Sequence, residues 1–345
     1  MAKETEKNVT IKNIAERLNI SFSTVAKALN DDPVVKEETR KRVREKAAEL
    51  GYFPNSIARG LRSNTTKTIG IILNDIENPT RTHIVKRISV DLASLGYTTL
   101  IFDSLYDTEI ERKNILTVLS RKPDSIVISP VSIYSENLSL LKNVLDRTII
   151  LSRIFESVPA NYVHMDHNRG GYISATTMLK AGHSRNIIFA EPPDFPSSDQ
   201  FLSGIRRAYD EYGVSFNEEM MIYGTPSLDA GFQGLCNLYD FQKKKFKLSF
   251  SGIIAGCDLF AFGVYKAATK IGFRIPEDIS IIGYDDNPMA ALSTPPLTTM
   301  HMPKEAIATH CSEILVSKLI NEDPTIKSFS LEPYLIQRES IKKIG

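Results

Sequence analysis

The sequence predicts a small α-helical domain at the N-terminus, followed by an α/β core of two doubly wound lobes built on parallel sheets. The chain has 345 residues, more than one hydrophobic core usually holds. Residues 9–53 contain three short amphipathic windows, whereas from residue 68 onward apolar strand candidates alternate with helical windows. About 270 residues of such alternation are more than one sheet needs, so two lobes are expected.

Three helices are expected in the N-terminal domain. Thr10 can cap the first helix, and Ser21 can cap the second, which spans 22–30. A polar loop precedes the third helix, at about 36–50, and Gly51 ends it. Each helix presents a few apolar side chains on one face, so the three together predict a minimal bundle.

A polar stretch separates this domain from the first strong strand, TIGIILN. We therefore predict a domain at 1–54, a linker at 55–67 and the two-lobed core at 68–345. The leading strand candidates of the core are 68–74, 98–103, 125–130, 148–152, 162–165, 186–190, 252–255 and 279–283.

Composition excludes several classes of protein. No apolar run approaches the roughly 18 residues of a membrane-spanning helix, and the polar N-terminus lacks the apolar segment of a secretory signal, so a cytoplasmic protein is expected. Three widely spaced cysteines fit neither a disulfide framework nor a zinc site, and we expect no metal or cofactor. Residues 1–64 carry a net charge of +4 against −3 for the remainder, a weak indication that an anionic partner meets the N-terminal end.

Several spaced motifs resemble the LacI family of regulators. The N-terminal segments are NISFSTVAKALN and ETRKRVREKAAELGYFPNSIARGLRS. The resemblance continues through TIGIILNDIENP, MDHNRGGY, LKAGH, IPEDISIIGYDD and PPLTTM, in this order along nearly the whole chain. It implies a helix-turn-helix head, a hinge that becomes helical on operator DNA, and a homodimeric core like that of periplasmic sugar-binding proteins. A transcription regulator, most simply a repressor that responds to a small-molecule effector, is the function it implies.

The resemblance also implies which residues of the head meet double-stranded DNA. Phe22 and Ser23 match base-reading positions at the start of the second helix, and Lys27 stands where many members carry arginine. The alternatives are that Phe22 is a core residue and that Lys27 is a solvated surface lysine. Small polar residues near helix ends suit phosphate contacts: Thr10, Ser21, Thr24 and Asn30.

In the linker, the segment NSIARGLR matches the hinge of the family. There Leu61 corresponds to a leucine that wedges between base steps in the minor groove, with Asn55, Ala58 and Arg59 close to it. The alternative is that Leu61 packs on the core. Gly60 weakens the hinge helix, which agrees with a helix that forms only on DNA.

In the core, polar residues that follow strands are the candidate effector ligands, because α/β lobes bind ligands at the carboxyl ends of their strands. These residues are Asp75, Asn78, Arg81, Arg153, Asp166, Asp258 and Asp285. For each aspartate the alternative is a helix cap. The resemblance to sugar-binding members breaks at three places: residues 80–82 and Pro226 replace aromatic residues, and Phe201 replaces an arginine. The cleft is therefore open to a different ligand, such as an anion bound by Arg81 and Arg153.

Three other functions compete with a regulator controlled by a small molecule. An enzyme is disfavoured because the chain lacks the nucleophile elbow, the phosphate loop, the dinucleotide fingerprint and the zinc-protease motif. A solute-binding protein would need an export signal and no N-terminal head. A DNA-binding regulator controlled by a protein partner remains open, because three typical sugar contacts are missing.

Overall fold

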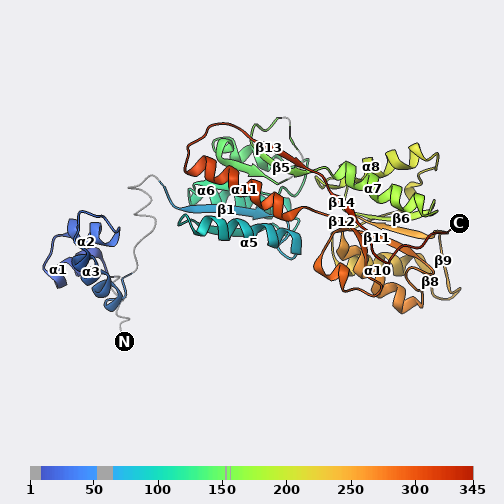
Figure 1. The fold of residues 1–345 in the computed structure, drawn as a ribbon, viewed down its shortest axis with the longest axis horizontal. Helices are drawn as coiled ribbons and strands as arrows, with labels where there is room; N and C mark the ends of the chain where they lie inside the picture. The colour runs from blue at the N-terminus through green and yellow to red at the C-terminus, as the bar shows by residue number, and fades with distance from the viewer. Residues whose placement is uncertain (1–8, 53–64, 152–153, 156, 345) are drawn as a thin grey trace. The chain divides into compact units, whose positions relative to one another are not determined.

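The computed structural model describes residues 9–52, 65–151, 154–155 and 157–344. The chain divides into two compact units, Met1–Thr66 and Lys67–Gly345, which are treated separately below (Figure 1). In the described part, no helix combines the length and the apolar character that a membrane crossing requires.

The first unit is the expected three-helix bundle. Its helices are α1 (Ile11–Leu18), α2 (Phe22–Leu29) and α3 (Glu37–Glu49), each within a residue or so of its predicted bounds. Ile14, Val25 and Val43, one from each helix, are fully buried in the centre of the bundle. The small apolar core therefore fixes the angles between the helices.

A tight turn joins α1 to α2. Asn19 adopts a left-handed conformation (φ 52°) at the end of α1, which asparagine tolerates better than most residues. Two residues later the Ser21 hydroxyl accepts a hydrogen bond from the Thr24 backbone amide (3.0 Å) and so caps α2. The turn directs α2 across α1, the arrangement of a helix-turn-helix.

The first lobe of the second unit is a six-stranded, fully parallel sheet in the order β13-β5-β4-β3-β1-β2. Its strands are β1 (Thr68–Leu73), β2 (Thr98–Asp103), β3 (Ser125–Ile128), β4 (Thr148–Ile150), β5 (Asn161–Met165) and β13 (Ser328–Leu331). Its helices are α5 (Pro79–Ala93), α6 (Thr108–Ser120) and α11 (Lys304–Leu319).

The second lobe repeats this plan in the order β14-β12-β11-β10-β6-β7, with only β14 antiparallel. Its strands are β6 (Asn186–Ala190), β7 (Met221–Tyr223), β10 (Gly252–Ala255), β11 (Ser280–Asp285), β12 (Thr298–His301) and β14 (Tyr334–Ile336). Its helices are α7 (His167–Lys180), α8 (Ser198–Glu211), α9 (Leu228–Leu238) and α10 (Asp258–Ile271). A small hairpin of β8 (Tyr239–Asp240) and β9 (Lys245–Phe246) follows α9.

The two doubly wound lobes with mostly parallel sheets are confirmed. All eight leading strand candidates are strands, and those at 98–103, 186–190 and 252–255 have the predicted bounds. The eight candidates do not include the strands β7, β12, β13 and β14 or the small hairpin.

The chain passes between the lobes three times. It leaves the first lobe after β5, returns after β12 to form α11 against α5, and crosses again between β13 and β14 (Figure 1). The crossings contact one another: the Asp166 amide donates to the Leu331 carbonyl (2.9 Å), and Arg169 pairs with Glu332 (3.1 Å). Each lobe is therefore completed by a segment that returns from the other lobe: β13 in the first lobe and β14 in the second.

Close packing of α7 against α8 depends on two glycines. A Cβ on Gly171 would lie 2.0 Å from the Phe201 carbonyl oxygen, and one on Gly204 would lie 1.9 Å from that of Asn168. Because these neighbours are backbone atoms of the facing helix, a side chain at either position would push the helices apart. The start of α8 is thereby held close to the start of α7, and both lie beside the cleft described next.

Candidate functional site

The outward face of α2 is the first candidate site. Phe22 is 50% exposed, and Ser23 and Lys27 are also exposed, whereas Val25 and Ala28 on the opposite face are buried. The alternative that Phe22 belongs to the core is therefore wrong. The three outward residues form one surface that a partner can contact.

The small polar residues of the head have structural roles. The hydroxyls of Ser21 and Thr24 lie 2.8 Å apart at the start of α2, and the Thr10 hydroxyl and amide both donate to Asn13 Oδ1 (2.8 and 2.9 Å). Asn30 follows the last residue of α2 and is exposed. The structure shows these residues at the ends of helices. Their contacts with DNA phosphates remain a prediction.

Five predicted residues cannot be placed in either site. Asn55, Ala58, Arg59, Leu61 and Arg153 lie outside the residues that the structure describes. Their roles remain predictions from the sequence.

The second candidate site is a cleft with walls from both lobes. It encloses about 1010 Å³, counted to its solvent-open mouth. In each sheet the strand order reverses between two neighbouring strands, β1 and β3 in the first lobe and β6 and β10 in the second. Asn74, Ser129, Glu191 and Cys257 follow these four strands and all line the cleft, as the rule for ligand sites in doubly wound sheets predicts.

Three buried polar atoms at the cleft have no hydrogen-bond partner among the described residues: Asn74 Oδ1, Arg81 Nε and His164 Nδ1. Buried polar groups are almost always paired, and an unpaired one costs about 1–3 kcal/mol. One acceptor, one donor and one imidazole nitrogen that can be either are therefore open to a bound molecule.

Asp285 adds a carboxyl group at the end of β11. Its backbone has φ 116°, a region that costs a non-glycine residue energy, and no hydrogen bond reaches its carboxyl group among the described residues. Burial, followed by the nearby Asp258 and Glu191, raises the pKa of Asp285 well above its usual value. Burial also raises the pKa of Glu191, although a hydrogen bond from Ser197 opposes this shift.

Arg81 brings a guanidinium group to the same cleft. Burial lowers the pKa of His167 to about 4, and Arg81 adds to that shift, so the imidazole is neutral at pH 7 and bonds the Tyr284 hydroxyl (3.1 Å). No ion pair to Arg81 is found within the described ranges. The site is therefore a polar cleft in which no carboxylate of the described residues forms an ion pair with Arg81.

Of the seven residues predicted from strand ends, Asn78, Arg81 and Asp285 line the cleft. Three aspartates do not line it, and for these the prediction needs correction. Asp75 accepts from the Glu77 amide (2.8 Å), and Asp166 caps α7 by accepting from the Arg169 amide (2.8 Å). Asp166 is therefore a helix cap, as its alternative stated, whereas Asp75 caps no helix: Asn78 caps α5, and the second carboxyl oxygen of Asp75 accepts from the Tyr106 hydroxyl (3.4 Å).

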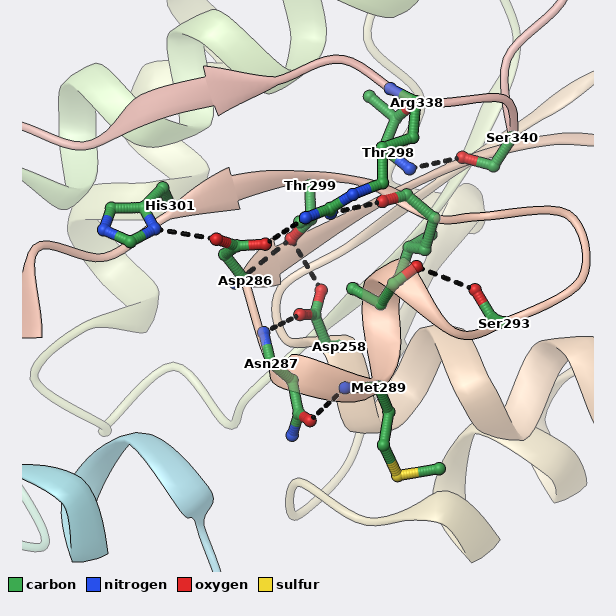
Figure 2. Close-up of polar contacts among 12 residues, drawn as sticks. Asp258, Asp286, Asn287, Met289, Ser293, Thr298, Thr299, His301, Arg338 and Ser340 are labelled. Atoms are coloured by element: carbon green, nitrogen blue, oxygen red, sulfur yellow. Dashed lines mark hydrogen bonds and ion pairs between the residues drawn. The ribbon is translucent and has the colours of Figure 1, made fainter.

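Asp258 is the third correction: it does not line the cleft, and Figure 2 shows its contacts. Its carboxyl oxygens accept from the Asn287 amide (2.7 Å) and the Thr299 hydroxyl (2.6 Å), inside the second lobe. A Cβ on Gly283 would lie 2.1 Å from Asp258 Oδ1, so only glycine admits this packing. Burial raises the pKa of Asp258 to about 7.

A neighbouring network was missed from the sequence. Figure 2 shows Asp286 between His301 and Arg338, from which it accepts hydrogen bonds of 2.8 and 2.7 Å. His301 also stacks on Tyr334, with ring centroids 4.6 Å apart. Burial raises the pKa of Asp286, but the hydrogen bonds from His301 and Arg338 outweigh it and lower the pKa below its usual value. The network holds the ends of β11, β12 and β14 together where the chain changes lobes.

Two models of known protein families match parts of the chain. Residues 10–55 match the model "Bacterial regulatory proteins, lacI family", and residues 175–341 match "Periplasmic binding protein-like domain". The HTH-type transcriptional repressor PurR of Vibrio atlanticus is 27% identical over 341 residues, which cover 97% of this chain and 99% of the relative. The HTH-type transcriptional regulator RegA of Clostridium saccharobutylicum is 28% identical over 334 residues, 96% of this chain and 98% of the relative.

A solved structure agrees with the fold. The Lac repressor dimer bound to operator and the anti-inducer ONPF superimposes with a TM-score of 0.81 at 22% identity, over 97% of this chain and 100% of that one. The similarity extends over both units.

The corrected role of Asp258 predicts a pH dependence of stability. Because its pKa in the folded chain (about 7) exceeds the usual 3.8, its contribution to stability is full below pH 3.8 and is lost as the pH rises toward 7. In Asp258→Asn the amide can still accept from Asn287 and donate to Thr299, but it does not titrate. Denaturant unfolding from pH 4 to pH 7 should show the parent losing on the order of a few kcal/mol relative to this variant.

The exposed Asp210→Asn is the matched control and should follow the parent. Asp258→Ala should be less stable at every pH, because two buried donors lose their acceptor. Identical pH profiles for the parent and Asp258→Asn would contradict this role for Asp258.

Proposed function

This chain belongs to the LacI family of bacterial regulatory proteins and is a DNA-binding transcription regulator, and from this premise we propose how it reads DNA and what controls it. It acts as a cytoplasmic repressor that places α2 in the major groove of operator DNA. A small molecule in the cleft between the lobes changes its affinity for the operator. The relatives named above are regulators, and no catalytic role is proposed.

The observation that carries the DNA-binding proposal is the outward face of α2. Phe22, Ser23 and Lys27 are exposed on α2, whose opposite face packs in the bundle. These side chains can therefore contact bases without disturbing the core of the bundle. Lys27 can donate to guanine O6 or N7, although without the rigid fork of arginine. Ser21, Thr24, Thr10 and Asn30 lie at helix ends, where their polar groups suit phosphate contacts.

We propose a homodimer on a nearly palindromic site. One reading helix of eight residues supplies few base contacts, and two-fold pairing doubles them. The structural relative named above is a dimer on its operator, which supports this arrangement. On such a site, Leu61 and its neighbours Asn55, Ala58 and Arg59 would form the minor-groove hinge.

The chemistry of the cleft favours an effector rich in hydrogen-bond acceptors, with an anionic group. Arg81 offers an unpaired Nε, and the raised pKa values of Asp285 and Glu191 favour neutral carboxyl groups that can donate. Arg153 would strengthen an anion site. A sugar is less favoured, because Phe201 and Pro226 line the cleft where the family's sugar binders place an arginine and an aromatic residue.

The reading role of Lys27 is tested on a duplex selected from a random library by the full chain. Lys27→Ala should weaken binding to the selected duplex by about 1–3 kcal/mol and flatten the preference at one symmetric pair of positions, with little change on random DNA. Lys113→Ala on α6, also an exposed lysine, should bind like the parent. Equal losses on selected and random DNA would mean that Lys27 contacts only phosphate.

The effector role of the cleft is tested by thermal unfolding against a panel of small anions and sugars. A compound present at a hundred times its dissociation constant should stabilise the parent by about 2.7 kcal/mol. Asp285→Asn should weaken this binding at least tenfold, whereas the exposed Asp210→Asn should retain it. Full stabilisation of Asp285→Asn would contradict the site, and a panel without any stabiliser would favour control by a protein partner.

A further inference from the structure

Two contacts join the first lobe to the second beside the cleft, apart from the crossings of the chain. The rings of Tyr106 and Phe195 are stacked, with centroids 5.1 Å apart and planes inclined by 14°. The backbone amide of Ile133 donates a hydrogen bond to the carbonyl of Asp194 (2.8 Å). Tyr106 and Ile133 belong to loops of the first lobe, whereas Asp194 and Phe195 belong to one loop of the second. We name these four residues the latch.

In the second lobe, prolines and hydrogen bonds restrain the loop that carries Phe195. Residues 191–197, EPPDFPS, connect β6 to α8, and three of these seven residues are proline, whose ring fixes the backbone angle φ. The Phe195 amide donates to the Pro192 carbonyl (3.0 Å), and the Ser198 hydroxyl donates to the Glu191 carbonyl (2.7 Å). Phe195 is therefore held in position by its own loop.

In the first lobe, an unfavourable turn orients Tyr106. Leu105 and Tyr106 have φ of 51° and 56°, left-handed conformations that are costly for residues other than glycine and asparagine. The Tyr106 amide donates to the Asn74 carbonyl (2.9 Å), and its hydroxyl donates to Asp75 Oδ2 (3.4 Å). Backbone strain of this kind persists only where the surrounding structure fixes it, and it is concentrated at functional positions. The ring that this turn orients is the one that contacts the second lobe.

The latch lies next to residues that line the cleft. Tyr106 is bonded to Asn74, and Phe195 directly precedes Pro196; both Asn74 and Pro196 line the cleft. Pro130 lines it as well and lies shortly before the donor of the latch hydrogen bond. Because the two halves of the latch belong to different lobes, the lobes cannot separate on this side unless the latch opens. The latch therefore restrains the movement through which a molecule enters or leaves the cleft.

We propose that the latch holds the two lobes together on one side of the cleft and thereby controls the entry and release of an effector. A stacked aromatic pair favours the closed position through its own contact, independently of what the cleft contains. A molecule enclosed between the lobes must therefore fit beside the closed latch, and a larger one must separate the two rings at a cost in affinity. The role in effector exchange rests on the function proposed above, whereas the contact between the lobes does not.

Two cysteines of the chain can report whether the cleft opens. Cys257 lines the cleft and is 4% exposed, and burial raises the pKa of its thiol well above the usual value, so its alkylation is slow while the lobes are closed. Cys311, on α11, is fully buried in the hydrophobic core and does not line the cleft. Opening of the lobes exposes Cys257 alone, whereas unfolding exposes both thiols.

The test measures alkylation of the full chain by iodoacetamide, without DNA or effector, and identifies the modified cysteines by mass spectrometry. In Phe195→Ala and in Tyr106→Ala, Cys257 should be alkylated about threefold faster or more than in the parent, because the loss of an aromatic pair shifts the balance toward the open position by about that factor. Cys311 should react at the parent's rate. Tyr106→Phe keeps the ring and should behave like the parent.

The matched control is Phe216→Ala, which removes a half-buried ring of the second lobe that packs on Tyr209 (5.5 Å) and should leave the rate at Cys257 unchanged. Deuterium exchange of the Ile133 amide is a second readout and should accelerate only in the two alanine variants of the latch. Parent-like rates at Cys257 in both of these variants overturn the latch. An equal rise at Cys311 overturns it as well, because the rings would then stabilise the fold rather than the contact between the lobes. Either result leaves the proposed function in place, since effector binding is tested separately by thermal unfolding.

Discussion

The three passages of the chain between the lobes are the constraint on which the core depends. Because β13 completes the first sheet and β14 the second, neither lobe is finished until the chain has crossed for the last time. The crossings are tied by the Asp166–Leu331 hydrogen bond, the Arg169–Glu332 pair and the Asp286 network. Relative motion of the lobes is thereby confined to a few short segments, which lie next to the cleft.

The two walls of the cleft, one from each lobe, carry different polar groups. The first lobe contributes Asn74, Arg81 and His164, each with an unpaired buried atom, and the second contributes Glu191 and Asp285, with pKa values raised by burial. A ligand that forms hydrogen bonds with both walls removes the free-energy cost of the unpaired buried groups. Such a ligand also stabilises the relative position of the lobes in which both walls can reach it. Ligand binding and lobe position are therefore expected to be coupled.

The sequence predicted the repeating parts of the fold and part of the site. Long apolar strands such as 186–190 were predictable because periodicity and composition mark them, whereas the three- and four-residue strands β12 and β14 depend on neighbours far along the chain. Asp258 follows the buried strand β10 and Asp285 ends the buried strand β11, and nothing in the local sequence distinguishes their roles. The difference comes from Asn287 and Thr299, which lie 29 and 41 positions from Asp258 and take up its carboxyl group.

The central claim is that a molecule in the cleft changes the affinity for DNA. The most direct measurement is the dissociation constant of the full chain for its selected duplex, with and without a compound whose stabilising effect requires Asp285. Coupling between two sites is typically 1–3 kcal/mol, so the dissociation constant should change by about fivefold or more in one direction. A compound that occupies the cleft but leaves DNA affinity unchanged would contradict the account.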